Sequence, residues 1–210
     1  MSTQLESDDA VAAPYVSTGH LPPPDEVRAL VAQAYERYKS NTEGNNSQVY
    51  PALARVPSHL FGTCVVGTSG KAYPIGDSNY EFTIMSVSKP FVFALVCEIL
   101  GPDQVWEKVG ANATGLAFNS LESVERFHGQ TNPMVNSGAI ATTSLVPGPN
   151  LMTKWQFIHE GLSRFTGRRL PLNEEVFASS SETNYPNQSI ARLLQSYGRI
   201  YMDPVDATDV

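Results

Sequence analysis

The residues best suited to chemistry are a serine and a lysine three positions apart. Residues 86–90 read Ser-Val-Ser-Lys-Pro and open a run of apolar residues that predicts a helix over about 86–100. Positions three apart share one face of a helix, so the Ser86 hydroxyl and the Lys89 ammonium can come within hydrogen-bonding distance. Serine needs a base to act as a nucleophile near neutral pH, and a lysine serves when burial lowers its pKa. The pair predicts covalent catalysis by Ser86, with Lys89 as its proton-transfer partner.

A structural interpretation of the same residues is that Ser86 caps a helix and Lys89 extends into solvent. The four residues Ser-x-x-Lys alone favour this interpretation, because the pattern is common. The surrounding helix has almost no polar face, since most positions from 87 to 96 are apolar. We therefore expect a central helix with Lys89 not wholly in solvent, and a buried lysine needs a reason.

A second candidate is Asn136, within the segment Thr-Asn-Pro-Met-Val-Asn-Ser-Gly-Ala-Ile of residues 131–140. Its amide offers both a donor and an acceptor, which suits the binding of an amino acid or an amide. Asn136 also stands at a predicted helix start, where asparagine is a common N-cap. Both interpretations stay open on the residues alone.

The pattern along the chain predicts an α+β fold in which helices pack on a small antiparallel sheet. Residues 1–23 are predicted to be a flexible leader, and 24–210 one part of a catalytic domain. Residues 60–66 and 71–75 are rich in strand formers, and Gly-Thr-Ser-Gly between them predicts a hairpin. Helices are predicted over about 25–39, 86–100, 102–109, 138–146, 152–166 and 187–200. A two-stranded hairpin needs further partners to be stable.

Composition limits the partners of the chain. Its 210 residues carry a net charge of −7, which argues against nucleic acid or anionic lipid as a partner. The first residues lack the basic start and apolar stretch of a signal peptide, and no apolar run is long enough for a membrane span, so we expect a cytoplasmic protein. Cys64 and Cys97 are predicted to be buried free thiols. The four histidines show no close spacing, so no metal site is predicted.

An ordered set of segments resembles the serine-dependent glutaminases, whose catalytic domain is related to β-lactamases and penicillin-binding proteins. The segments are Gly76-Asp77, Phe82, residues 86–90, Gly110, Thr114-Gly115-Leu116, Phe118-Asn119 and residues 132–140. The resemblance covers about residues 25–210, and the segment around Asn136 is its most specific part.

The resemblance implies hydrolysis of L-glutamine to L-glutamate and ammonia without a cofactor. Ser86 would be acylated as a γ-glutamyl ester, and Lys89 would transfer its proton. Asn136 and Asn187 would bind the amino-acid part of glutamine. These enzymes are commonly tetramers, which implies a homo-oligomer.

Three departures from the family pattern concern the substrate. A carboxylate usually stands seven residues before Asn187 and contacts the α-amino group, but that position holds Ser180. Glu182 matches only if the loop is locally re-registered. Pro186 stands where an arginine is common, and the order Val-Tyr-Pro at 49–51 displaces or removes a tyrosine near the substrate.

The family pattern also continues beyond residue 210, with tyrosines and a Lys-Ser-Gly-like strand that carries an oxyanion-hole N–H. We therefore expect a chain with missing C-terminal strands and little activity. Two other functions stay open: a non-catalytic fragment that binds glutamine or regulates a partner, and a D,D-peptidase or β-lactamase-like acyltransferase.

Overall fold

The structure, a computed structural model, describes residues 22–210. The leader predicted for residues 1–23 lies almost entirely outside this range. The described chain divides into two compact units, one formed by the described part of Met1–Gly44 with Ser58–Tyr80, the other by Asn45–Pro57 with Glu81–Val210. Each unit builds its own core, so each is treated separately below.

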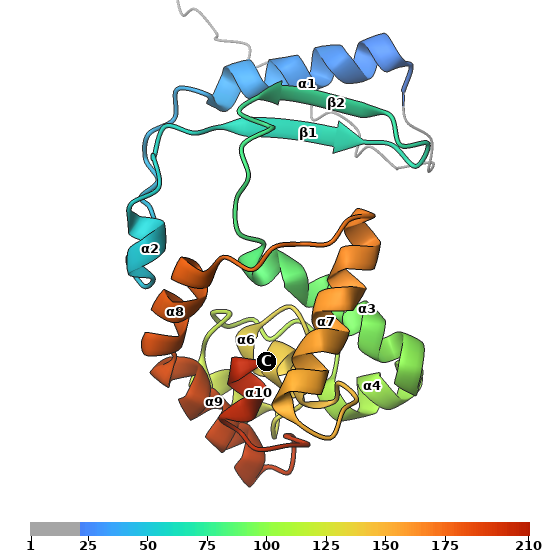
Figure 1. Ribbon diagram of the computed structural model, residues 1–210, viewed down its shortest axis with the longest axis vertical. Helices are drawn as coiled ribbons and strands as arrows, with labels where there is room; N and C mark the ends of the chain where they lie inside the picture. Colours follow the sequence, from blue (N-terminus) through green and yellow to red (C-terminus); the bar gives the residue numbers. More distant parts are fainter. Residues whose placement is uncertain (1–21) are drawn as a thin grey trace, which may run out of the picture. The chain divides into compact units, whose positions relative to one another are not determined.

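The first unit is a helix packed on a hairpin (Figure 1). Helix α1 (Pro24–Tyr38) begins with a proline and two acidic residues, which suit the first turn of a helix. Strands β1 (Gly62–Val66) and β2 (Ala72–Gly76) pair antiparallel, with Gly62 opposite Gly76. Alternate side chains of the strands face α1, where they pack in a small cluster of Val27, Val31, Val65, Tyr73 and Ile75. The predicted helix and hairpin are confirmed within two residues.

The same alternation corrects the prediction for one cysteine. Val65 packs toward α1, so its neighbour Cys64 points to the opposite face of the hairpin and is exposed. Cys97 is half-buried, and both thiols are free. The apolar neighbours of Cys64 in sequence predicted burial, but a strand covered on one face buries only alternate residues.

The second unit is helical (Figure 1). Its long elements are α3 (Ser88–Leu100), α4 (Pro102–Val109), α6 (Asn136–Ser144), α7 (Leu151–Thr166), α8 (Glu174–Glu182) and α9 (Tyr185–Ser196). Shorter ones are α2 (Pro51–Ala54), the 3₁₀ helix η1 (Met85–Val87), α5 (Leu121–Arg126) and α10 (Asp206–Asp209). The helix predicted over 102–109 is confirmed to the residue, and the others predicted here agree within a few residues at each end.

Helix α8 and the short helices α2, α5 and α10 were not predicted. Segments of four to six residues are too short to show helical periodicity. Helix α8 contains three consecutive serines, which are weak helix formers. Its start is instead stabilised by Asn173, whose side chain accepts a hydrogen bond of 3.0 Å from the Val176 N–H.

Helix α3 packs against α4, α6 and α7 in the second unit. Gly101, at a φ of +84°, ends α3, and Pro102 begins α4 directly afterwards. The core consists mainly of aliphatic side chains, among them the fully buried Val96, Val105, Val109, Val124, Ala141, Ile190 and Leu194. This core holds the start of α3, and hence the Ser-x-x-Lys segment, beside α6.

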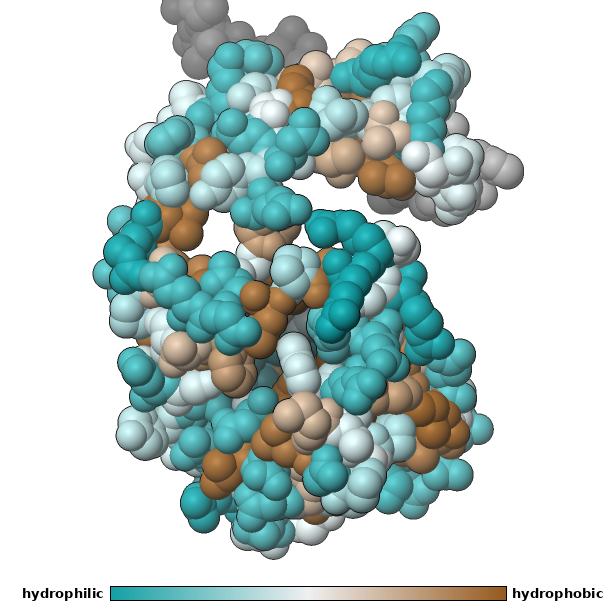
Figure 2. Space-filling view, in the orientation of Figure 1, coloured by the Kyte–Doolittle hydropathy of each residue, from teal (hydrophilic) through white to brown (hydrophobic). Residues whose placement is uncertain are grey.

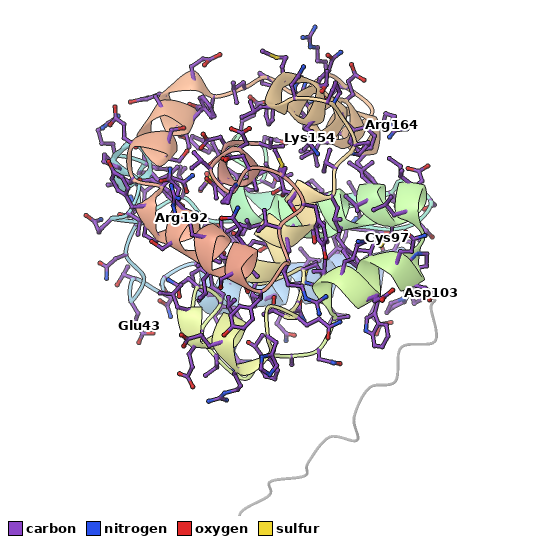
Figure 3. All side chains as sticks on the ribbon, turned by 90° about the horizontal axis from the view of Figure 1, so that it is seen from below. Glu43, Cys97, Asp103, Lys154, Arg164 and Arg192 are labelled. Atoms are coloured by element: carbon purple, nitrogen blue, oxygen red, sulfur yellow. The ribbon has the colours of Figure 1, made fainter. Side chains whose placement is uncertain are left out.

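Lys154 is an unusual member of the interior. It lies on the inner side of α7 and is only 8% exposed, whereas Arg164 of the same helix lies at the surface (Figure 3). Its ammonium donates a hydrogen bond to the Val146 carbonyl. Burial lowers the pKa of Lys154 below its ordinary value of 10.5. Lys154 therefore ties the start of α7 to the segment that follows α6.

The surface of the helical unit is mixed in character. Figure 2 shows hydrophilic residues over most of its visible face, with hydrophobic residues in separate groups between them. Within residues 22–210, no helix combines the length and the apolar composition that a membrane crossing requires.

The close packing of α7 on α3 gives a first prediction. A Cβ added to Gly161 would lie 2.3 Å from Leu95 Cδ1, and Leu95 is only 3% exposed. Gly161→Ala should therefore lower the free energy of unfolding by about 1–3 kcal/mol through overpacking. Urea unfolding followed by circular dichroism measures the difference.

The matched control places the same substitution in a Leu95→Val background, which lacks both δ-carbons. There Gly161→Ala should cost markedly less, because the contact that causes the strain is gone. An equal cost in both backgrounds would contradict packing against Leu95 as the cause.

Candidate functional site

A cavity of about 360 Å³ opens in the second unit. It is lined by residues of η1, α3, α6, α7, α8, α9 and α10. The predicted site residues Ser86, Lys89, Asn136 and Asn187 all line it, although they are up to 101 positions apart in sequence. The fold thus brings four of the five predicted site residues to one cavity.

Ser86 lies in η1, directly before α3, and is exposed. The residue before it, Met85, has a φ of +42°, in the left-handed region that residues other than glycine seldom adopt. The Ser88 hydroxyl donates a hydrogen bond of 2.7 Å to the Met85 carbonyl and helps to fix this turn. Such backbone strain costs on the order of 1–3 kcal/mol and is concentrated at functional sites. Sequence analysis missed Met85, because methionine gives no signal for this conformation.

Lys89 lies in the first turn of α3 and is half-buried. Its Nζ donates to Asn136 Oδ1 at 2.8 Å and to the Met134 carbonyl at 3.4 Å. It also lies 5.8 Å from the centre of the Phe118 ring. Burial lowers the pKa of Lys89 below 10.5. The prediction that Lys89 is not wholly in solvent is confirmed, and its lowered pKa favours the neutral amine that a base requires.

Asn136 is the first residue of α6, but its side chain does not cap the helix. The N-cap residue is Val135, and no side-chain cap is formed there. The Asn136 amide instead accepts from Lys89 and donates to Asn187 Oδ1 at 3.0 Å. The capping interpretation of Asn136 is therefore wrong, and its amide belongs to the cavity.

Asn187, on α9, continues the same series of hydrogen bonds. Its Nδ2 donates to Asn184 Oδ1 at 2.9 Å, and Asn184 Nδ2 donates to the Thr208 carbonyl at 3.3 Å. Asn184 also lines the cavity. Sequence analysis missed Asn184, since an asparagine in a polar connection between helices is expected for structural reasons alone.

The two alternatives for the substrate carboxylate lie differently. Ser180 lines the cavity, whereas Glu182 is exposed and is not among the residues that line it. Residues two apart on α8 point about 200° apart around the helix axis, so both cannot face the cavity at once. Asp209 of α10 supplies an acidic side chain to the cavity wall instead.

The structure also shows where the other two departures from the family pattern lie. Tyr50, whose position was uncertain from sequence, lines the cavity from the start of α2. Pro186 stands in the first turn of α9, where a missing backbone N–H costs little.

The cavity offers a hydroxyl, an amine of lowered pKa and three amides, which is the chemistry of acyl transfer to an oxygen nucleophile. Within the described part of the chain, no group of three or more His, Cys, Asp or Glu side chains lies close enough to hold a metal ion.

Comparison with known proteins identifies the family of the chain. A family model described as glutaminase matches residues 44–210. The chain belongs to the glutaminase family. It is 57% identical over 211 residues to glutaminase 2 of Yersinia pestis, and 46% identical over 187 residues to a glutaminase of Brucella canis. These alignments cover 99% and 89% of this chain but 62% and 59% of the relatives, so the chain spans about six tenths of their length.

Solved glutaminases have the same architecture. The probable glutaminase ybaS is 39% identical, with a TM-score of 0.84 over 90% of this chain and 61% of that one. A Bacillus glutaminase is 27% identical, with a TM-score of 0.76 over 88% of this chain and 59% of that one. The predicted α+β fold of the β-lactamase-like type is confirmed.

Gly138 of α6 gives a prediction specific to this candidate site. A Cβ there would lie 2.0 Å from the Asn132 carbonyl oxygen, a backbone atom that cannot turn aside as a side chain can. The loop that Gly138 contacts carries the Met134 carbonyl, one of the two acceptors for Lys89. Gly138→Ala should therefore destabilise the protein by about 1–3 kcal/mol or more and disturb the Lys89 environment.

Thermal unfolding and the Lys89 Nζ resonance of ¹⁵N-lysine-labelled protein measure the two effects. Gly44→Ala serves as the control, because no atom lies within 4 Å of a Cβ at that position. A Gly138→Ala protein with wild-type stability and an unchanged Lys89 resonance would show that the loop adapts freely.

The burial of Lys89 predicts its titration. Because the folded state disfavours the ammonium, the Lys89 Nζ midpoint should lie below 10.5 in the folded protein. The folded state then binds fewer protons than the unfolded state between the two pKa values, so Lys89 adds stability as pH rises through that window. The reference is the same nucleus in urea-unfolded protein, and an equal or higher folded-state midpoint would refute the prediction.

Proposed function

We propose that the chain carries the Ser/Lys site of a glutaminase, which hydrolyses L-glutamine to L-glutamate and ammonia. The observation that supports this most is that Lys89, with its pKa lowered by burial, lines one cavity with Ser86 and donates to Asn136. Membership of the glutaminase family supports the choice of substrate.

In the proposed reaction, Ser86 Oγ attacks the carbon of the substrate side-chain amide while neutral Lys89 accepts the hydroxyl proton. The tetrahedral intermediate expels ammonia, and Lys89 returns its proton to the departing nitrogen. This leaves a γ-glutamyl ester on Ser86. A water molecule then attacks the ester, giving L-glutamate and restoring the serine hydroxyl.

The position of Ser86 before the N-terminus of α3 suits this chemistry. The helix macrodipole provides a positive field at that end, which stabilises negative charge on the oxygen of the tetrahedral intermediate. Lys89, whose amine receives the proton, is the second residue of α3. Nucleophile, base and helix terminus therefore come from one short segment.

We propose that Asn136 and Asn187 bind the amino-acid part of glutamine through the donors and acceptors that their mutual bonds leave free. For Glu182 to bind the α-amino group, the last turn of α8 would have to rotate, because Ser180 faces the cavity instead. By resemblance to the family, we also propose a cytoplasmic homotetramer that needs no cofactor.

One observation favours a second candidate, glutamine binding without turnover. Lys89 Nζ donates to Asn136 and to the Met134 carbonyl, and neither bond reaches Ser86. A lysine held in this way can complete a binding site for a carbonyl or carboxylate without acting as a base.

Ammonia release from L-glutamine tests the proposal. Whatever rate the chain reaches, Ser86→Ala should lower it by about 1,000-fold or more, because no other group replaces the nucleophile. Lys89→Met should lower it similarly, through loss of the base. Ser189→Ala is the control, since Ser189 is an exposed residue of α9 that does not line the cavity.

Calorimetry with L-glutamine on the same proteins separates the two candidates. Binding by wild type and by Ser86→Ala, without ammonia from either, would support the binding function. If L-glutamine neither binds nor reacts, both candidates are wrong.

A further inference from the structure

Three asparagine side chains connect Lys89 to the backbone of α10. The bonds run from Lys89 Nζ to Asn136 Oδ1 at 2.8 Å, from Asn136 Nδ2 to Asn187 Oδ1 at 3.0 Å and from Asn187 Nδ2 to Asn184 Oδ1 at 2.9 Å. Asn184 Nδ2 then donates to the Thr208 carbonyl at 3.3 Å. We call this series the amide chain. It joins α3, α6, α9 and α10 around the cavity.

The two ends of the amide chain agree on one direction. A lysine ammonium has only donors, so Asn136 must turn its oxygen toward Lys89. A backbone carbonyl has only acceptor capacity, so Asn184 must turn its NH₂ group toward Thr208. Each amide between them then has one permitted orientation, with oxygen toward Lys89 and nitrogen toward α10.

Asn184 is free for this task because it does not cap its own helix. It is the N-cap residue of α9, yet its φ and ψ of −80° and 3° are not extended, and no side-chain cap is formed. Its side chain instead bonds Asn187 and the Thr208 carbonyl. The Asn184 amide therefore bonds other groups around the cavity and does not cap α9.

We propose that Asn184 is a positioning residue for Lys89, which keeps Asn136 Oδ1 directed at the lysine even after the lysine has given up its proton. The proposal rests on the proposed function, in which Lys89 must be neutral before it can accept the proton of Ser86.

The neutral amine of Lys89 differs from the ammonium in its donors and acceptors. Neutral lysine has two N–H donors and one lone pair, so at that end alone the amide chain could reverse. Reversal is blocked at the other end, because it would turn Asn184 Oδ1 against the Thr208 carbonyl oxygen, leaving two acceptors face to face. Lys89 must then keep an N–H on Asn136, and its lone pair is left for other groups of the cavity, Ser86 among them.

Other titratable groups line the same cavity. Tyr50, at the start of α2, and Asp209 of α10 both line it. Both remain unchanged in variants of Asn184, so differences among those variants report on the amide chain.

The test compares Asn184→Ala with Asn184→Asp. The alanine removes both bonds of Asn184, so the neutral lysine gains the reversed arrangement and the Lys89 titration midpoint should fall. The aspartate loses the bond to the Thr208 carbonyl, but it can only accept from Asn187, so it keeps the direction of the amide chain between Asn187 and Lys89. Its negative charge should raise the midpoint. The Lys89 Nζ resonance of ¹⁵N-lysine-labelled protein reports both shifts without any turnover, so the test stands even if the proposed function fails.

Turnover of L-glutamine provides the second readout. Asn184→Ala should lower kcat by about tenfold through misdirection of the base, and Asn184→Asp should restore kcat to within about threefold of wild type. Gln188→Ala, on the same helix but outside the cavity lining, should change neither readout. The proposal is overturned if Asn184→Ala leaves the Lys89 midpoint at the wild-type value, or if Gln188→Ala shifts it equally.

Discussion

The hydrogen bond between Lys89 and Asn136 is the interaction on which the site depends. It joins the start of α3 to the start of α6, 47 residues apart in sequence. A half-buried ammonium needs acceptors, and two come from one short segment, the Met134 carbonyl and the Asn136 amide. That segment can approach only because Gly138 lacks a side chain where the Asn132 carbonyl passes. The hydrogen bonds of one lysine therefore link the packing of α3 and α6 to the conformation of the loop between residues 132 and 136.

Lys154 and Lys89 of the second unit have similar hydrogen-bond partners but different roles. Lys154 and Lys89 are both held by neutral acceptors, and burial lowers the pKa of each. Lys154 bonds a backbone carbonyl beneath α7 and lies outside the cavity lining, so its bond serves the fold. Lys89 opens onto a cavity with an exposed serine on its wall. The opening of Lys89 onto the cavity separates it, as the lysine suited to chemistry, from the structural Lys154.

Sequence patterns predicted the parts of the site that carry a local signature. Ser86 and Lys89 share three-residue spacing in an apolar helix, and Asn136 and Asn187 stand in segments that resemble the family. Met85 and Asn184 could not be predicted, because a left-handed φ at methionine and an uncapped helix start arise from tertiary contacts. Whether Ser180 or Glu182 faces the cavity depends on the helical conformation of α8. That helix could not be predicted from residue propensities, because its three serines are weak helix formers. Helices such as α1 and α9 could be predicted because each buries apolar residues at helical spacing. Cys64 was misplaced because the sequence does not show which face of a hairpin is covered.

The amide chain also determines where a proton can go. Carboxamides neither gain nor lose protons near neutral pH, so the three asparagines orient Lys89 without offering it an exit. On the side of Asn136 the lysine is therefore held by a group that orients it but cannot take up its proton. A proton that Lys89 takes up leaves to some group other than these amides, such as the serine, a bound molecule or water. A molecule that occupies the cavity takes the place of water beside the lysine, so it and Ser86 become near partners for proton exchange.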